Sequence, residues 1–327
     1  MVVGKNYDFY SGAGLLMVNS RNLKKTSYPA PDAKPITWVA RYGSISFNQF
    51  GKEFPCGGMN EKGLVIESMW LDETQYPVED SRKGMFELQW IQYQLDNAAS
   101  VAEVLASDTL VRISRMSALI HFLIADADGN TAIIEFIDGE TVVHTGSNLS
   151  HCALANNPYT ESVGFFDSLT NPGEYLKNTP NGSNNRFSKA ALMARDFEKQ
   201  SEIEYAFSIL DAVRQGDFTQ WSIVYDITNQ TIHYKTKNNS LARTVNLRKF
   251  DFNCDSPRRV HDIDEAVASE DKFQVYSYEK NRETMVTAFS ALDEFPELHN
   301  FIPSKVEREI LARYPESVGC LTTTKSN

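Results

Sequence analysis

The chain has 327 residues, of which 42% are hydrophobic, 11% aromatic and 23% charged. Its 32 Lys and Arg residues against 43 Asp and Glu residues give a net charge of −11, which disfavours binding to nucleic acid phosphates or anionic lipid. The longest apolar runs fall far short of the roughly 18 residues that span a bilayer, and the aromatic content disfavours disorder. We therefore expect a folded chain of one large or two modest domains that binds neither nucleic acid nor membrane.

Cysteines and histidines show no spacing typical of a metal site. The four cysteines contain no CxxC pair, so we expect most of them to be reduced and inert. The six histidines contain no HxxxH or HxH pair, and the chain has no glycine-rich nucleotide-binding motif. We expect neither a metal nor a cofactor.

Apolar alternation predicts antiparallel strands early in the chain and again after residue 220. The predicted strands are residues 36–41, 43–47, 63–70, 118–126, 131–136, 140–144, 221–227 and 231–236, with 244–252 as an extension of the last. Turn-forming residues join several neighbours: Asp128-Gly129-Asn130, Asp138-Gly139 and Thr228-Asn229-Gln230.

Helical spacing lies between these blocks of strands. It predicts helices over 88–97, over 101–106 with Ser100 as N-cap, and over 203–213 with Gly216 ending the last. Hairpins, then helices, then hairpins favour an α+β fold with two layered sheets. The strict strand–helix alternation of a doubly wound parallel sheet is absent.

Four short segments carry polar residues that folding alone does not require. They are Gly4–Phe9, Gly57–Leu64, Leu154–Pro158 and Asn184–Phe187. Taken singly, each is explained by a turn or a helix cap. Their order along the chain is more informative than any one of them.

Together the segments resemble the choloylglycine hydrolase or penicillin V acylase family of N-terminal-nucleophile amidases. Gly4–Phe9 resembles the family's Gly-Arg-Asn-x-Asp-Trp segment, and Gly58–Leu64 is similar to its Gly-Met-Asn-Glu-Lys-Gly-Leu signature. Asn156–Pro158 resembles a Thr-Asn-x-Pro turn, and two later segments, 185–187 and 218–222, match further motifs. The resemblance covers residues 4 to about 237, and the remaining C-terminal part carries no recognised motif.

The resemblance implies a single domain over 1–327 with the four-layer αββα sandwich of this superfamily. It also implies hydrolysis of linear, non-peptide amide bonds, as in penicillin V, N-acyl amides or bile salts. In the family, an N-terminal cysteine attacks the amide and its own α-amine is the base, since an α-amine titrates near pH 8. Such chemistry needs no histidine.

The family's site residues map onto four polar positions. Asp8 matches the carboxylate that holds the N-terminal amine, and Asn156 matches an amide of the oxyanion hole. Arg186 matches the guanidinium that orders the site near the nucleophile. Lys5 stands where the family usually has Arg, and it keeps the charge but loses the bidentate fork.

Two aromatic residues bear on the substrate. Trp70 stands where bile-salt-cleaving members have Asn and some penicillin acylases have Tyr. A tryptophan at this position presents a flat apolar face to the substrate, which favours an aliphatic or aromatic acyl group over a bile salt. We expect Phe9 to line the same cavity. The expected partner is a small-molecule amide, and assembly into dimers or tetramers stays open.

The family's cysteine lies about fifteen residues before the glycine that matches Gly4, so the resemblance implies a nucleophile and first strand that precede Met1. Cys56 is not a substitute, because its amine lies in a peptide bond. We expect an amidase whose recorded sequence starts internally and is inactive as written. The alternative is a pseudoenzyme that only binds acyl ligands. Residues 1–6 have no signal-peptide pattern, but a preceding segment can hold one, so the compartment stays open.

Overall fold

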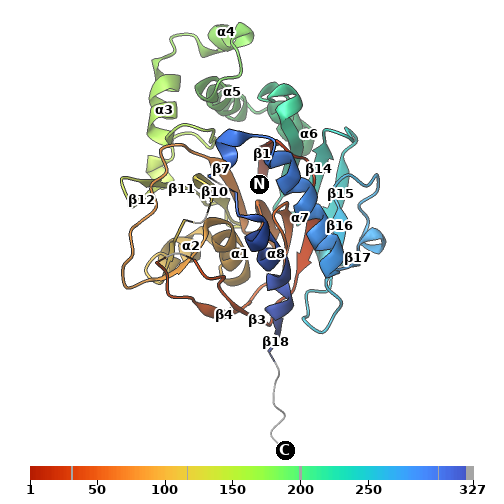
Figure 1. Ribbon diagram of the computed structural model, residues 1–327. Coiled ribbons are helices and arrows are strands. Elements are labelled where there is room, and N and C mark those ends of the chain that lie inside the picture. Colours follow the sequence, from red (N-terminus) through yellow and green to blue (C-terminus); the bar gives the residue numbers. More distant parts are fainter. Residues whose placement is uncertain (31, 116, 199–200, 301, 322–327) are drawn as a thin grey trace, which may run out of the picture.

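The computed structural model describes residues 1–30, 32–115, 117–198, 201–300 and 302–321 (Figure 1). Two antiparallel sheets form its centre. The four-stranded sheet has the order β1 (Val2–Asp8), β13 (Thr219–Asp226), β14 (Thr231–Thr236), β15 (Arg243–Asn246). The nine-stranded sheet has the order β12 (Glu140–Thr145), β11 (Thr131–Ile137), β10 (Ile120–Ala125), β7 (Val65–Trp70), β6 (Gly57–Asn60), β5 (Ser44–Asn48), β2 (Leu15–Asn19), β16 (Arg259–Asp262), β17 (Gln274–Val275).

One core lies between the two sheets. Alternate residues of a strand face the same side, so Leu16 and Val18 of β2 point toward the four-stranded sheet. Trp221, Ile223 and Tyr225 of β13 point back toward them, and all five side chains are at most 3% exposed. This period of two is the pattern that predicts strands in the sequence.

Helices cover the outer face of each sheet. On the nine-stranded sheet, α1 (Glu87–Asn97) packs against β6 and β7, whereas α6 (Glu202–Ala212) packs against β1 and β13 of the other sheet. The order helix, sheet, sheet, helix is the αββα sandwich that we expect from the sequence. The remaining helices are α2 (Val101–Ser107), α3 (Tyr159–Ser168), α4 (Pro172–Tyr175), α5 (Ser183–Arg195), α7 (Tyr278–Leu292) and α8 (Lys305–Arg313).

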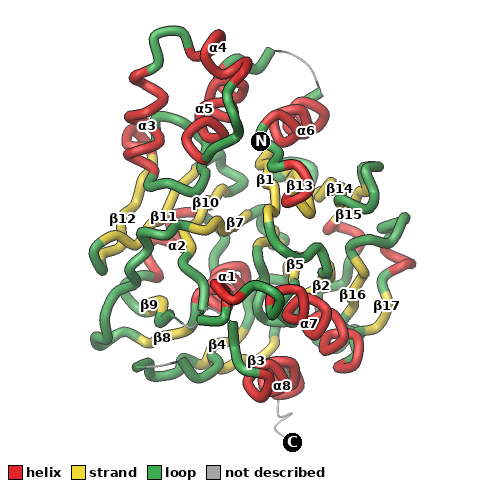
Figure 2. Tube along the Cα trace, turned by 45° about the horizontal axis from the view of Figure 1, so that its top comes forward, coloured by secondary structure: helices red, strands yellow, loops and turns green. Residues whose placement is uncertain are grey.

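Helices also flank β1. Figure 2 shows β1 between α5 and α6 on one side and α7 on the other. Two small sheets complete the fold: β3 (Leu23–Thr26) between β4 (Thr37–Val39) and β18 (Gly319–Cys320), and the parallel pair β8 (Lys83–Met85) and β9 (Val111–Ile113). Among the described residues, no helix has the length and apolarity to cross a bilayer.

Most predicted local signals are present. Ser100 caps α2, where its side chain accepts the Glu103 N–H at 3.3 Å. The turn between β11 and β12 has positive φ at Asp138 (54°) and Gly139 (80°), as a two-residue hairpin turn requires.

Three expectations are wrong. Residues 244–252 do not continue as a strand, because β15 ends at Asn246 and a 3₁₀ turn follows. Gly216 lies beyond the end of α6, and its φ of 56° belongs to the next 3₁₀ turn. Cys254 and Cys320 form a disulfide across 66 residues, so only Cys56 and Cys152 are free thiols.

Candidate active site

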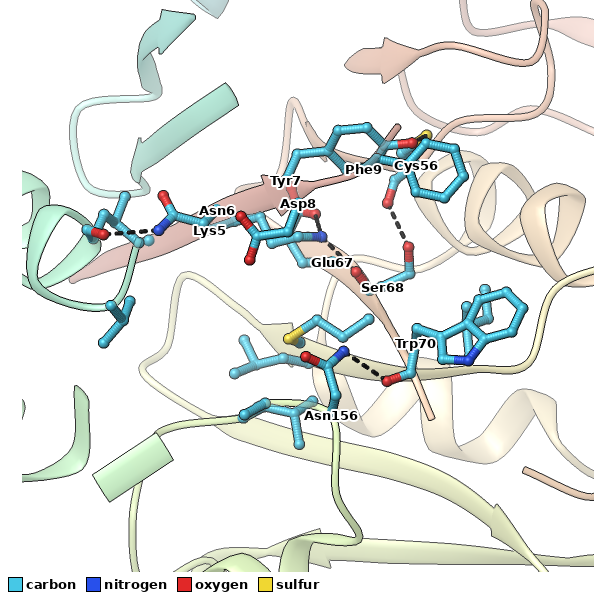
Figure 3. A pocket seen from close by; sticks show the side chains of 18 of the residues that line it. Lys5, Asn6, Tyr7, Asp8, Phe9, Cys56, Glu67, Ser68, Trp70 and Asn156 are labelled. Atoms are coloured by element: carbon cyan, nitrogen blue, oxygen red, sulfur yellow. Dashed lines mark hydrogen bonds and ion pairs between the residues drawn. The ribbon is translucent and has the colours of Figure 1, made fainter. Parts of the chain in front are cut away.

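A cavity of about 1010 Å³ runs along β1, and each of the first ten residues contributes to its lining. Polar side chains reach it from β1, from β7 and from the loop that carries Asn156 (Figure 3). Arg186 of α5 also lines it. The six residues singled out from the sequence all line this one cavity: Lys5, Asp8, Phe9, Trp70, Asn156 and Arg186. Their chemical roles stay predictions.

Lys5 forms a buried ion pair in this cavity. Its Nζ lies 2.9 Å from Glu67 Oε2, and it also donates to the carbonyl of Ser68. The Tyr225 hydroxyl donates to the other oxygen of Glu67. The side chains of Lys5 and Glu67 are only 6% and 4% exposed, so each charge depends on the other for compensation.

Sequence reasoning missed Glu67. The signal that would have found it is a carboxylate inside the apolar run that forms β7, where an unpaired charge is costly.

Asp8 ends β1 at an irregularity in the pairing with β13. Its two carboxylate oxygens accept hydrogen bonds from the Thr219 hydroxyl and, at 2.7 Å, from Gln215 Nε2. These neutral donors hold the carboxylate at the cavity without neutralising its charge. Burial lowers the pKa of Arg186, and the negative charge of Asp8 opposes that shift, which places the two groups in one electrostatic environment.

The amide of Asn156 is fixed from both ends. Its Nδ2 donates to the Trp70 carbonyl at 2.8 Å, and its Oδ1 accepts from the Arg186 guanidinium. Arg186 is held in turn by the Asn181 carbonyl at 2.8 Å. An amide nitrogen carries two hydrogens, so this arrangement leaves the second Nδ2 hydrogen for another acceptor. That is the provision an oxyanion hole needs.

Trp70 and Phe9 supply aromatic surface. The Trp70 indole donates to Asp72 at 2.6 Å, and the Phe9 ring packs against Tyr7 and Phe50 with centroid distances of 5.5 and 5.9 Å. Both side chains line the cavity close to the polar group.

Two cysteines also line the cavity. Cys56 is 4% exposed, with its sulfur 3.6 Å from the Tyr7 hydroxyl, and burial raises the pKa of its thiol to about 11. Burial also raises the pKa of Cys152. A nucleophilic cysteine needs a lowered pKa, so within the described part of the lining neither thiol is activated.

One group of metal-type ligands, Cys254, Asp255 and Cys320, lies elsewhere. Its two sulfurs form the disulfide and are not available as thiolates.

Much of the remaining lining is apolar, and two groups of these residues bear on the substrate. The α6 lobe is formed by Ala190, Ala194, Phe197, Tyr205, Ala206, Ile209, Leu210 and Val213. The α7 lobe is formed by Phe50, Phe54, Phe86, Leu88, Phe289, Leu292, Leu298, Ile302 and Leu311. Sequence reasoning missed the α7 lobe, because five of its nine residues lie in the C-terminal part without a recognised motif.

Comparisons with known proteins found a matching family model and similar proteins. Residues 1–190, more than half of the chain, match the family model of linear amide C–N hydrolases, choloylglycine hydrolase family. A penicillin V acylase of Pectobacterium atrosepticum is 24% identical, over 66% of this chain and 69% of that protein.

Two solved structures have the same fold. A penicillin V acylase from Agrobacterium tumefaciens superposes with a TM-score of 0.73 at 23% identity, covering 84% of this chain and 94% of that one. A variant of the conjugated bile acid hydrolase from Clostridium perfringens has a TM-score of 0.65 at 16% identity, covering 84% and 93%.

Proposed function

The chain belongs to the choloylglycine hydrolase family of linear amide C–N hydrolases, and we propose that it cleaves N-acyl amides whose acyl group is apolar. One observation carries the proposal. Lys5, Asp8, Asn156 and Arg186 all line one largely apolar cavity that is large enough for a small-molecule amide.

In the proposed reaction, the four polar residues act on different atoms. Asp8 holds the attacking residue's amine, and the free Nδ2 hydrogen of Asn156 stabilises the oxyanion of the tetrahedral intermediate. Arg186 keeps the Asn156 amide in that orientation. Lys5 is committed to Glu67 and Ser68, so we assign it to the shape and charge of the site rather than to the substrate.

The acyl group is proposed to pass Trp70 and Phe9 into the α7 lobe. Phenylalanine, leucine and isoleucine side chains dominate this lobe, and burying an acyl chain against them gains about 0.8 kcal/mol per methylene. A bile salt presents hydroxyl groups along its steroid, which this lining cannot hydrogen-bond. Penicillin V and long-chain N-acyl amides are therefore the preferred substrates.

The nucleophile is proposed to be a cysteine on a strand that pairs with β1. In the four-stranded sheet β1 is the terminal strand. The Ile227 N–H donates to the Met1 carbonyl at 3.1 Å, and the Phe9 N–H donates to the Phe218 carbonyl at 2.9 Å. The backbone groups of odd-numbered residues of β1 therefore point toward β13. The backbone groups of Gly4 and Asn6 then point to the other edge, since pairing alternates along a strand.

A hairpin at this edge gives the nucleophile its position. Consider an upstream strand that runs antiparallel to β1 and is joined to it by a turn. In that strand, the residue about fifteen positions before Gly4 would lie opposite the end of β1 that carries Asp8. The resemblance to the family implies a cysteine there, with its α-amine within reach of Asp8.

The test compares two proteins: residues 1–327, and the same chain with the residues that its natural gene encodes upstream. Both are assayed on penicillin V, a long-chain N-acyl amide and a glycine-conjugated bile salt. We expect turnover only by the extended protein, abolished when the upstream cysteine is changed to alanine. Turnover by residues 1–327 that survives Cys56→Ala would refute the assignment of the nucleophile.

A second candidate is a binding protein without catalysis. The raised pKa of Cys56 and of Cys152 favours it, because neither described thiol of the lining is a competent nucleophile. An upstream sequence without cysteine, together with stoichiometric binding of an acyl amide by calorimetry and no turnover, would support this candidate over the hydrolase.

A further inference from the structure

A buried His–Glu–His cluster lies on three neighbouring strands and is not part of the cavity lining. Glu135 of β11 stands between His121 of β10 and His144 of β12. Its Oε1 is 3.0 Å from His121 Nδ1, and its Oε2 is 3.0 Å from His144 Nε2. The three residues are 0%, 1% and 7% exposed in the order His121, Glu135, His144. The reaction proposed above uses none of them.

The cluster holds the loop that carries Asn156, on both sides of that residue. His121 Nε2 lies 2.8 Å from the carbonyl oxygen of Ala155. The backbone N–H of Tyr159 donates to Glu135 Oε1 at 2.9 Å. The Tyr159 hydroxyl also accepts the His151 N–H at 3.0 Å, which fastens the start of the loop.

The hydrogen-bond partners fix which ring nitrogen of His121 must carry a hydrogen. The Ala155 carbonyl can only accept, so Nε2 must carry it. Nδ1 then faces Glu135 Oε1, which also accepts the Tyr159 N–H, and the other oxygen of Glu135 faces His144 Nε2.

The hydrogen bonds of the cluster also favour the carboxylate form of Glu135. Burial by itself would raise the pKa of Glu135, but the hydrogen bond and charge of His121, with the Tyr159 N–H and His144, bring that pKa below its ordinary value. The titratable groups around His121 are Glu135, His144 and Tyr159, with His151 at the start of the loop.

We propose that His121, held by Glu135, is a positioning residue that fixes the Asn156 amide at the oxyanion site. The inference rests on the proposed role of Asn156. The His121 ring holds the carbonyl next to Asn156, and Glu135 holds the N–H three residues later. The amide is then presented in one orientation to Arg186 and to the substrate.

The first test needs no turnover. In ¹⁵N-labelled protein at pH 7, the ring-nitrogen signals of His121 should show a hydrogen on Nε2 that exchanges slowly with solvent, whereas the ring hydrogen of His233, which bonds only to hydroxyl groups, should exchange faster. In Glu135→Gln, the Nε2 hydrogen of His121 should exchange faster, because the carboxylate that orients the ring is lost. A His121 without a hydrogen on Nε2 in the unaltered protein would overturn the proposal.

The second test follows the loop. Hydrogen exchange at residues 152–157 should quicken by about tenfold or more in His121→Gln, since the amide has no pair of nitrogens spaced as in the ring to reach Ala155 and Glu135 at once. The matched control is His233→Gln, on β14 of the other sheet, and it should leave the loop unchanged. Unchanged exchange in a folded His121→Gln protein would contradict the clamp. Should that variant fail to fold, Glu135→Gln and the ring signals of the unaltered protein still decide.

In protein that turns over, His121→Gln should lower kcat by about 10²-fold with little change in KM, because the misplaced amide acts mainly on the transition state. A change confined to KM would overturn the positioning role. If no amide is hydrolysed by any form of the protein, the proposed function fails, and the ring signals and loop exchange still decide this inference separately.

Discussion

At the residue scale, the site depends on polar side chains whose partners leave them little freedom. The Asn156 amide is bonded to Trp70 on β7 and to Arg186 on α5, and its backbone N–H donates to Ser183 at 2.8 Å. Two elements, β7 and α5, therefore determine where one amide hydrogen points. A donor held in place before the reaction costs no reorganisation when negative charge develops.

In the form of the protein that hydrolyses amides, Asn156→Ala should lower kcat by about 10²–10³-fold and change KM only a few-fold. The reason is that the oxyanion exists only in the transition state and the intermediate. Steady-state kinetics on penicillin V measures both constants. The control is Asn157→Ala, whose side chain bonds Glu161 at 3.0 Å and does not line the cavity. An equal loss in both variants would show that the loop, rather than the Asn156 amide, matters.

A second buried charge cluster lies away from the cavity. Lys25 pairs with Glu53 at 2.6 Å and Asp96 at 2.8 Å, and Lys52 Nζ lies 3.6 Å from Glu53 and donates to Asn19 at 2.7 Å. Burial lowers the pKa of Lys52 from 10.5 to about 8, with the charge of Glu53 opposing and those of Lys25 and Arg258 assisting.

This pKa predicts a pH-dependent stability. Between pH 8 and 10.5 the unfolded chain keeps the Lys52 proton and the folded chain releases it. The free energy of unfolding should therefore rise with pH across this window, by up to about 3 kcal/mol from Lys52 alone. Buried tyrosines with raised pKa values act in the opposite direction, so the measured quantity is the difference from Lys52→Met in urea unfolding. Parallel curves for the two proteins would contradict the prediction.

At the element scale, the sequence predicts what its periodicity and motifs encode. Strands such as β10 and β11, and the helices α1 and α6, follow from alternation and helical spacing. β2 (LLMVN) is missed because every residue is buried, so no alternation appears. The cavity residues of β1 follow from the family motif, whereas Glu67 and the His121 cluster depend on pairing between distant strands, which no local pattern records.

The helices α7 and α8 are among the elements that sequence reasoning did not place. Among the buried residues of α7 are Met285, Phe289 and Leu292, which pack in one cluster with Phe54 and Phe86. Polar residues interrupt its apolar face, so the helical pattern is weak in the sequence. Through this packing the helix forms a wall of the α7 lobe.

Leu298→Trp should shorten the acyl group that the protein accepts. Leu298 is partly exposed in the lobe, so a larger side chain occupies cavity volume rather than the packed core. We expect kcat/KM to fall for long acyl chains and to hold for short ones, measured over a series of N-acyl amides. The control is Ile310→Trp on α8, where the Ile310 side chain is 50% exposed, and it should not change the chain-length preference. Equal loss for every chain length would mean that the acyl group lies elsewhere.

At the scale of the whole molecule, the C-terminal segment returns to the beginning of the chain. β16 pairs with β2, and β18 pairs with β3, so α7 and α8 are fastened to the sheets on both sides. The disulfide between Cys254 and Cys320 adds a covalent closure beside β18. The wall of the α7 lobe thus has its position set by contacts outside the cavity.

Replacing Cys254 and Cys320 by serine should destabilise the fold. The bridge joins residues 66 apart, and chain entropy for a loop of that length predicts a loss of up to about 4 kcal/mol. Urea unfolding of the oxidised protein and of the double variant measures the loss, and a reducing agent should bring the unaltered protein to the stability of the variant. Cys152→Ser, which removes an exposed free thiol, is the control and should have little effect on the free energy of unfolding.

The preference for long acyl chains should weaken together with stability in the double variant. Without the disulfide, only the short pairing of β18 with β3 holds the wall of the α7 lobe at its C-terminal side. A stable double variant with unchanged chain-length preference would show that the strands suffice to hold the wall.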